Sequence, residues 1–189
     1  MIETTIRGFE LAFETSDHQF SPRAIDAGTL ALLSVVDFKE GEKVLDLGCG
    51  YGVVGILAAR IVGPGNVLML DNDPAAVELS RMNCKRNGLE GVEVILSEGL
   101  AEVTATGFDL ILSNPPYHAD FSIARQFIEK GFNRLAIDGR MAMVTKRRKW
   151  YRNKLSSIFG GTRVQEVDGY QVFESVKLQS NYANATPRR

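Results

Sequence analysis

The stretch Val44-Leu45-Asp46-Leu47-Gly48-Cys49-Gly50-Tyr51-Gly52 decides the fold of this chain. Its apolar residues predict a buried strand over Lys43–Leu47, and its glycines predict a turn that opens a helix over Val53–Ile61. Glycines let a backbone approach a ligand closely, and a helix N-terminus offers N–H groups that lack partners within the helix. Asp46 would repel a pyrophosphate but suits the amino group of an amino-acid ligand. With its glycine spacing, the stretch disfavours a nicotinamide oxidoreductase.

Downstream of this stretch, short apolar runs alternate with segments of helical periodicity. This alternation is typical of βα units that build a mainly parallel sheet with helices on both faces. At the end of the chain, Asp168-Gly169 separates strands over Thr162–Val167 and Gln171–Leu178, which predicts an antiparallel hairpin. We expect an α/β fold with a Rossmann-like, seven-stranded sheet. The strands predicted before the hairpin are Lys43–Leu47, Asn66–Leu70, Val92–Leu96, Phe108–Ser113 and Arg140–Thr145.

Two helices between these strands carry clear boundary signals. Asp73 is suited to cap the N-terminus of one helix with Pro74 at its first position, and Asn87-Gly88 supplies its stop. A further helix is expected over Phe121–Leu135, ending before a turn at Asp138-Gly139.

The first part of the chain is predicted to be an addition to this domain. Alternating residues in Thr4–Phe13 indicate a small hairpin, and Ser21-Pro22 predicts the start of a helix that runs through Val36. We therefore divide the chain into an N-terminal hairpin and helix (1–36), the main domain (37–179) and a flexible tail (180–189).

The composition is that of a globular domain: the 189 residues are 44% hydrophobic and 24% charged. No signal peptide is visible, and no apolar run approaches the roughly 20 residues of a membrane span. Cys49 and Cys84 have no spacing pattern, which predicts free thiols, no metal site and a cytoplasmic location. The net charge of −1 argues against a protein that coats nucleic acid by bulk charge.

Acidic residues follow or end three successive predicted strands. Asp46 belongs to the first, Asp71 ends the second and Glu98 follows the third. Asp71 is placed to accept hydrogen bonds from ribose hydroxyls, and Glu98 to face an adenine amino group. A ligand with an ammonium, a ribose and an adenine but no phosphate is S-adenosylmethionine, an activated methyl donor.

The tetrapeptide Asn114-Pro115-Pro116-Tyr117 follows the fourth predicted strand. Two prolines make the backbone stiff and extended, so an amide and a phenol are held at the carboxyl end of the strand, where open α/β sheets bind ligands. A side-chain and a backbone carbonyl that accept the two hydrogens of a conjugated amine would make it a better nucleophile. The alternative is an ordinary proline-rich turn.

A basic segment lies near the predicted C-terminal hairpin, and its cations are interrupted by Trp150 and Tyr151. Cations interleaved with aromatic residues suit phosphates and bases, although the same pattern also fits the solvated first turn of a surface helix. Its cations are Lys146, Arg147, Arg148, Lys149, Arg152 and Lys154.

With these motifs in place, the chain resembles the class I S-adenosylmethionine-dependent methyltransferases. Among them it is similar to the "methyltransferase small" family, which includes ribosomal RNA guanine-N2 methyltransferases. The matching segments are Phe20-Ser21-Pro22 with Asp26-x-Gly28, Val44–Gly52, Asn114-Pro115-Pro116-Tyr117-His118, Tyr151, Phe159-Gly160 and Gly169-Tyr170-x-Val172.

The resemblance implies methylation of an exocyclic amino group of RNA, with guanine N2 in ribosomal RNA as the leading candidate. Asn114 and the Pro115 carbonyl would bind the target amine while Tyr117 stacks on the base. The implied cofactor residues are Asp46, Gly48, Gly50, Asp71, Asn72, Glu98 and Asn114. The implied substrate residues are Phe20, Ser21, Pro116, Tyr117, His118, Lys146, Arg147 and Arg148.

The resemblance leaves other functions open. The best-known small-subunit guanine-N2 enzymes carry a second, degenerate copy of the domain, whereas a single copy is recognised in this sequence. We therefore expect that single domain to engage ribosomal RNA or a ribosomal subunit, either through its basic segment or as a homodimer. No membrane partner is expected. A protein glutamine-N5 methyltransferase shares the Asn-Pro-Pro-Tyr motif but would not need the basic segment. A non-catalytic RNA-binding or ribosome-assembly factor would have no use for that motif.

Overall fold

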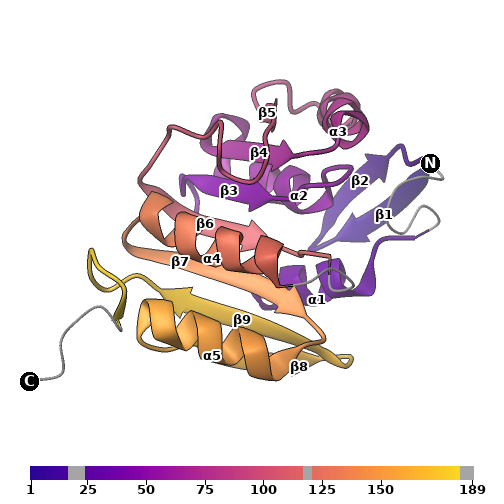
Figure 1. Cartoon of the computed structure of the whole chain (residues 1–189). Helices are drawn as coiled ribbons and strands as arrows, with labels where there is room; N and C mark the ends of the chain where they lie inside the picture. The colour runs from indigo at the N-terminus through magenta and orange to yellow at the C-terminus, as the bar shows by residue number, and fades with distance from the viewer. Residues whose placement is uncertain (17–23, 117–120, 184–189) are drawn as a thin grey trace, which may run out of the picture.

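A seven-stranded sheet forms the centre of the computed structural model, which describes residues 1–16, 24–116 and 121–183 (Figure 1). The strand order is β5-β4-β3-β6-β7-β9-β8, with β3 to β7 parallel and β9 antiparallel to both neighbours. This confirms the predicted sheet and its C-terminal hairpin. The strands are β3 (Val44–Leu47), β4 (Val67–Asp71), β5 (Glu93–Leu96), β6 (Phe108–Ser113), β7 (Leu135–Thr145), β8 (Arg163–Val167) and β9 (Tyr170–Val176).

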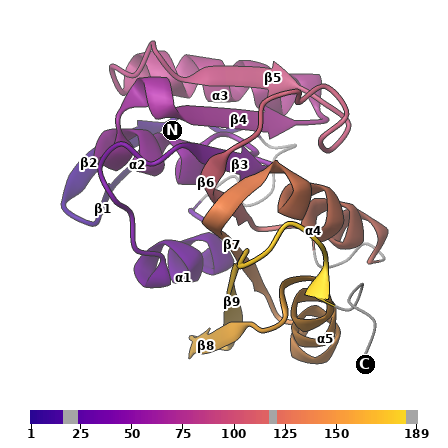
Figure 2. The same cartoon turned by 90° about the vertical axis from the view of Figure 1, so that its left-hand side faces the viewer.

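Helices cover both faces of the sheet, and each face has its own apolar core (Figure 2). Helices α1 (Ala27–Val35), α2 (Val53–Val62) and α3 (Pro74–Arg86) contribute to one core, while α4 (Ser122–Arg134) and α5 (Arg148–Phe159) contribute to the other. A short 3-10 turn, η1 (Pro64–Asn66), precedes β4. None of the helices in the described ranges has the length and apolar character needed to cross a bilayer.

In strand β3, the alternation of side chains between the two faces of the sheet determines where Asp46 lies. Val44 belongs to the core under α2, whereas Leu45 and Leu47 belong to the core under α4. Because side chains alternate between the two faces of a strand, Asp46 lies on the α2 face, where its carboxylate accepts a hydrogen bond from the Gly55 amide.

The predicted N-terminal hairpin is present as β1 (Ile2–Ile6) and β2 (Phe9–Phe13). It is held by two asparagines one helical turn apart, Asn83 within the last turns of α3 and Asn87 at its C-cap. Asn87 exchanges hydrogen bonds with the N–H and C=O of Ala12, and Asn83 does the same with Glu14. The two side-chain amides therefore satisfy backbone hydrogen-bonding groups of Ala12 and Glu14, as a neighbouring strand would.

Two predicted boundaries were wrong. Helix α1 begins at Ala27 with Asp26 as its N-cap, and residues 24–26 are not helical; Ser21-Pro22 lies outside the described residues. The expected turn at Asp138-Gly139 lies within β7, which begins at Leu135 directly after α4. Asp138 has a φ of 65°, and the pairing with β6 shifts register there, so these residues form a bulge in a continuous strand.

Candidate active site

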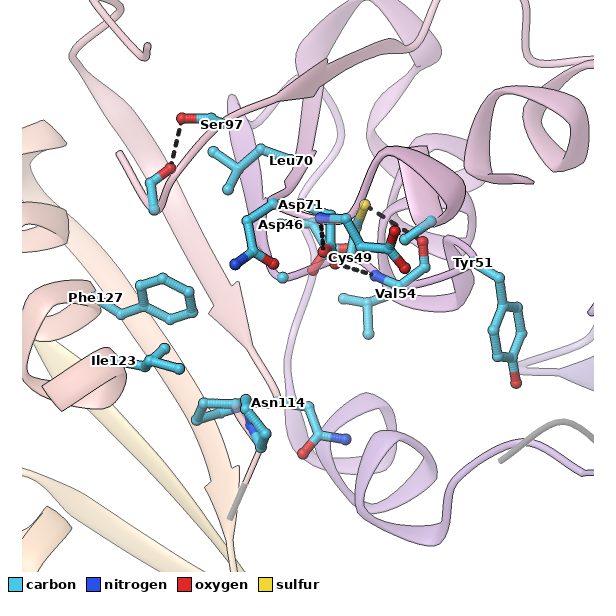
Figure 3. Close-up of a pocket in the computed structure, with 18 of the residues that line it drawn as sticks. Asp46, Cys49, Tyr51, Val54, Leu70, Asp71, Ser97, Asn114, Ile123 and Phe127 are labelled. Atoms are coloured by element: carbon cyan, nitrogen blue, oxygen red, sulfur yellow. Dashed lines mark hydrogen bonds between the residues drawn. The ribbon is translucent and has the colours of Figure 1, made fainter. Parts of the chain in front are cut away.

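A cavity of about 300 Å³ lies at the carboxyl edge of β3, β4 and β6. The strand order reverses between β3 and β6, and open α/β sheets bind ligands at such a point. Ile123 and Phe127 enter the cavity from α4, across from the glycine turn after β3 (Figure 3). Helix α1 closes a third side with Thr29.

The glycine turn is pinned to the end of β4. The N–H groups of Gly48 and Cys49 both donate to the Leu70 carbonyl oxygen at 2.9 Å. Gly52, with a φ of 100°, adopts a backbone conformation that a larger residue would strain. The turn therefore presents its backbone to the cavity in one fixed shape.

Asp46 is the most deeply buried acid of the site, with 2% of its surface exposed. Its carboxylate accepts one hydrogen bond, from the Gly55 N–H at 2.9 Å. Burial raises the pKa of Asp46 to about 7; the Gly55 hydrogen bond opposes this rise and the neighbouring Asp71 adds to it. A cation bound next to the Asp46 carboxylate would lower its pKa again and so favour the charged form.

Asp71 stands at the end of β4 with both carboxylate oxygens engaged. One accepts the Gly50 N–H at 2.9 Å and the other accepts the Asp73 N–H at 3.0 Å. Each oxygen of a carboxylate has capacity for a second hydrogen bond, so Asp71 is held in place and can still accept from hydroxyl groups.

All residues predicted to bind the cofactor line this one cavity. They are Asp46, Gly48, Gly50, Asp71, Asn72, Glu98 and Asn114. The described lining residues include five acids and no lysine or arginine. The acids are Asp26, Asp46, Asp71, Asp73 and Glu98. The electrostatics therefore favour a cationic ligand and oppose a phosphate.

Asn114 follows β6 directly and reaches toward α1. Its side-chain nitrogen donates to Asp26 Oδ2 at 2.8 Å and to Thr29 Oγ1 at 3.0 Å. Both hydrogens of the amide are thereby used, and its carbonyl oxygen keeps its acceptor capacity. Pro115 is buried and Pro116 is exposed, and both line the cavity.

Other predicted substrate residues are placed differently. Phe20, Ser21, Tyr117 and His118 lie outside the described residues. Lys146, Arg147 and Arg148 are exposed and are not among the residues that line the cavity. They follow β7, which pairs in parallel with β6 so that Met143 lies opposite Ser113. The basic segment therefore starts at the same sheet edge as Asn114, and α5 begins within it.

Several lining residues were missed from the sequence as site residues. Ile123, Gln126 and Phe127 read as ordinary positions of an amphipathic helix, and Thr29 as part of another. Asp26 could have been found from the sequence, because it belongs to the segment Asp26-x-Gly28 that resembles the methyltransferase family. A Cβ atom on Gly28 would lie 2.8 Å from the Tyr170 ring, so glycine allows α1 to pack closely on β9.

This fold and an acid-lined cavity next to Asn-Pro-Pro are features of a Rossmann-like methyltransferase. The family model described as "Methyltransferase small domain" matches residues 10–174, and the chain belongs to this family.

Ribosomal RNA small subunit methyltransferase C of Pseudomonas putida is 33% identical over 188 residues, covering 93% of this chain and 56% of that protein. YbxB of Bacillus subtilis is 29% identical over 179 residues, covering 92% of this chain and 89% of that protein. The chain thus spans about half the length of the curated methyltransferases that it matches, but most of YbxB.

Among solved structures, the Thermus thermophilus 16S rRNA N2 G1207 methyltransferase (RsmC), in complex with AdoMet and guanosine, has a TM-score of 0.86. It is 27% identical to this chain, and the alignment covers 93% of this chain and 50% of that one.

Proposed function

We propose that this chain is an S-adenosylmethionine-dependent N-methyltransferase that acts on guanine N2 in ribosomal RNA. The observation that carries the proposal is the cavity itself, whose described lining residues include five acids, no lysine and no arginine beside the Asn114-Pro115 segment. The named activities of the Pseudomonas and Thermus relatives support the choice of ribosomal RNA and of guanine. Such a substrate would place the protein in the cytoplasm.

The residues present fit S-adenosylmethionine, whose ammonium and sulfonium groups are cationic and which has no phosphate. Asp46 suits the ammonium group because an adjacent cation offsets the burial of its carboxylate. Asp71 suits the ribose hydroxyls, since its oxygens are fixed by Gly50 and Asp73. Asn72 and Glu98 line the part of the cavity after β4 and β5 and suit the adenine.

The bound cofactor would supply an electrophilic methyl group, and this chain would supply orientation for the acceptor. The Asn114 side-chain oxygen and the Pro115 carbonyl oxygen would each accept one hydrogen of the guanine amine. Positive charge would develop on that nitrogen as its lone pair forms the bond to the methyl carbon, while the bond from that carbon to the sulfonium sulfur breaks and its electron pair stays on the sulfur of the departing S-adenosylhomocysteine. The two fixed carbonyl dipoles would stabilise this charge, and the amine proton would then leave to solvent.

A guanine amino group reaches the cavity only when the base is unpaired or turned out of a helix. The basic segment begins one strand away from Asn114, at the same edge of the sheet. Its exposed cations suit the phosphates that flank such a base. Lys146, Arg147 and Arg148 are therefore proposed to bind the RNA backbone.

The test is transfer of a labelled methyl group from S-adenosylmethionine to small-subunit ribosomal RNA, followed by digestion to nucleosides. We expect N2-methylguanosine as the labelled product, and Asn114→Ala to lose turnover by orders of magnitude, far more than any loss of cofactor affinity. Label on a protein glutamine instead of RNA would support the N5 alternative. Equal turnover in Asn114→Ala would contradict the assignment of this residue.

A further inference from the structure

We propose that Asp26 and Thr29 are positioning residues that fix the amide of Asn114 with its oxygen toward the acceptor amine. This inference rests on the proposed function. It assigns a reaction role to the first turn of α1, a segment that lies 85 residues or more before Asn114 in the chain.

The hydrogen-bond partners determine which way the amide faces. Asp26 Oδ2 lies 2.8 Å from the Asn114 side-chain nitrogen, and an ionised carboxylate only accepts hydrogen bonds. If the amide were rotated by half a turn, its oxygen would face this carboxylate oxygen at the same distance. That contact is repulsive, so the nitrogen takes this place and Thr29 Oγ1 accepts its second hydrogen at 3.0 Å.

The orientation matters because the two ends of an amide have opposite hydrogen-bonding roles. In the observed orientation the carbonyl oxygen is the group left to accept a hydrogen from the target amine. In the reverse orientation an NH2 group would meet another NH2 group, and the developing positive charge would be destabilised. A free amide would divide its time between the two states, whereas Asp26 and Thr29 select the productive one.

The first turn of α1 is itself rigidly placed. Asp26 Oδ2 also accepts the Thr29 N–H at 2.9 Å, so one oxygen caps the helix and holds Asn114. Gly28 packs against the Tyr170 ring so closely that a Cβ atom would lie within 2.8 Å of it. Thr29 is 8% exposed. The partners of Asn114 are therefore fixed before any substrate arrives.

Thr29→Val is the cleanest test, because valine has the same shape, leaves the backbone cap intact and removes one acceptor. We expect kcat to fall about tenfold, as loss of one productive hydrogen bond predicts. The KM for RNA and the affinity for S-adenosylhomocysteine should change less than twofold. Thr29→Ser, which keeps the hydroxyl, should recover most of kcat relative to Thr29→Val.

Asp26→Ser separates the cap from the positioning contact. Serine is a good N-cap but its side chain is shorter, so the helix is retained while the contact with Asn114 is lost. We expect a fall in kcat with little change in the melting temperature. In an Asn114→Ala background, neither Asp26→Ser nor Thr29→Val should lower the residual single-turnover rate further.

The side-chain amide protons of Asn114, assigned in NMR spectra by their loss in Asn114→Ala, provide a readout that needs no substrate. One of the two should move upfield in Thr29→Val and stay in place in Thr29→Ser. A wild-type kcat in Thr29→Val, or equal losses in both Thr29 variants, would overturn the inference. If the wild-type protein transfers no methyl group to RNA, the proposed function fails, and unchanged amide protons in Thr29→Val would separately refute the orientation.

Discussion

The side-chain nitrogen of Asn83 in α3 lies 2.8 Å from the carbonyl oxygen of Tyr51 in the glycine turn. The same nitrogen donates to the Glu14 carbonyl oxygen at 3.0 Å, and Asn83 Oδ1 accepts the Glu14 N–H at 2.7 Å. One buried amide thus joins the end of the N-terminal hairpin to the turn that lines the cavity. The hairpin supports the site through this side chain.

Asn83→Ala should therefore destabilise the fold strongly. It leaves the partly buried backbone N–H and carbonyl of Glu14, and the carbonyl of Tyr51, without their partner. We expect the free energy of unfolding to fall by about 2–4 kcal/mol. Urea unfolding measures this loss, with the exposed Asn153→Ala in α5 as the control, for which we expect a change within about 0.5 kcal/mol. A comparable small change in Asn83→Ala would contradict the role of Asn83.

Cofactor affinity should depend on pH through Asp46. Burial raises its pKa to about 7, and a bound ammonium group would favour the charged carboxylate. Affinity for S-adenosylhomocysteine should therefore fall as the pH drops from 7 to 5.5, approaching about tenfold per unit well below the pKa. Over this range the ligand amino group stays protonated: even the α-amino group of a peptide has a pKa of about 7.7–8.0, and the adjacent carboxylate of the ligand raises the pKa further.

Calorimetric titrations at several pH values provide the measurement, and proton release on binding should be greatest near pH 6. Asp46→Asn should bind more weakly at pH 7.5 and lose most of the pH dependence. A wild-type affinity that rises steadily toward acid pH would exclude Asp46 as the group that contacts the ammonium.

Gly55→Ala should disturb the packing of α2 on β4. A Cβ atom there would lie 2.5 Å from Met69 Cγ, 2.6 Å from its sulfur and 3.1 Å from Asp46 Oδ2. We expect a loss of about 1–3 kcal/mol in the free energy of unfolding, together with weaker cofactor binding. Gly65→Ala, where a Cβ atom meets nothing within 4 Å, is the matched control. Equal stability in the two variants would contradict this packing argument.

Charge reversal in the basic segment should act on RNA binding alone. In Lys146→Glu/Arg148→Glu we expect a higher KM for RNA and a salt dependence whose slope falls by about one for each lost phosphate contact. Cofactor affinity should not change. Lys85→Glu is the control, because it also reverses a lysine charge but lies in the last turn of α3, away from the cavity. Equal KM values in both proteins would favour the protein glutamine alternative.

Much of the fold followed from local patterns because central strands such as β3 and β6 are buried on both faces and bounded by clear turns. Strand β6 occupies the predicted residues, Phe108–Ser113. The start of β7 was missed because Asp138-Gly139 is a strong turn signal, whereas here it forms a bulge within the strand. Helix α1 starts late because Asp26 caps it and also binds Asn114, a tertiary contact that local signals do not report.

The place of Asp46, Asp71 and Glu98 along one cavity could be predicted because carboxyl ends of parallel strands meet at one edge. The residues that come from helices could not, since Phe127 and Ile123 have the apolar character of core positions. The pairing of Asn83 with the hairpin also escaped prediction, because it joins segments 69 residues apart.

Methylation of guanine N2 in ribosomal RNA by this chain is tested most directly by mass spectrometry of ribosomal RNA nucleosides from cells with and without the chain. We expect N2-methylguanosine in small-subunit RNA to fall by one residue per molecule in cells without the chain. The wild-type gene should restore it and the Asn114→Ala variant should not. Unchanged N2-methylguanosine would exclude this chain as the guanine-N2 methyltransferase, and full restoration by Asn114→Ala would exclude Asn114 from the reaction.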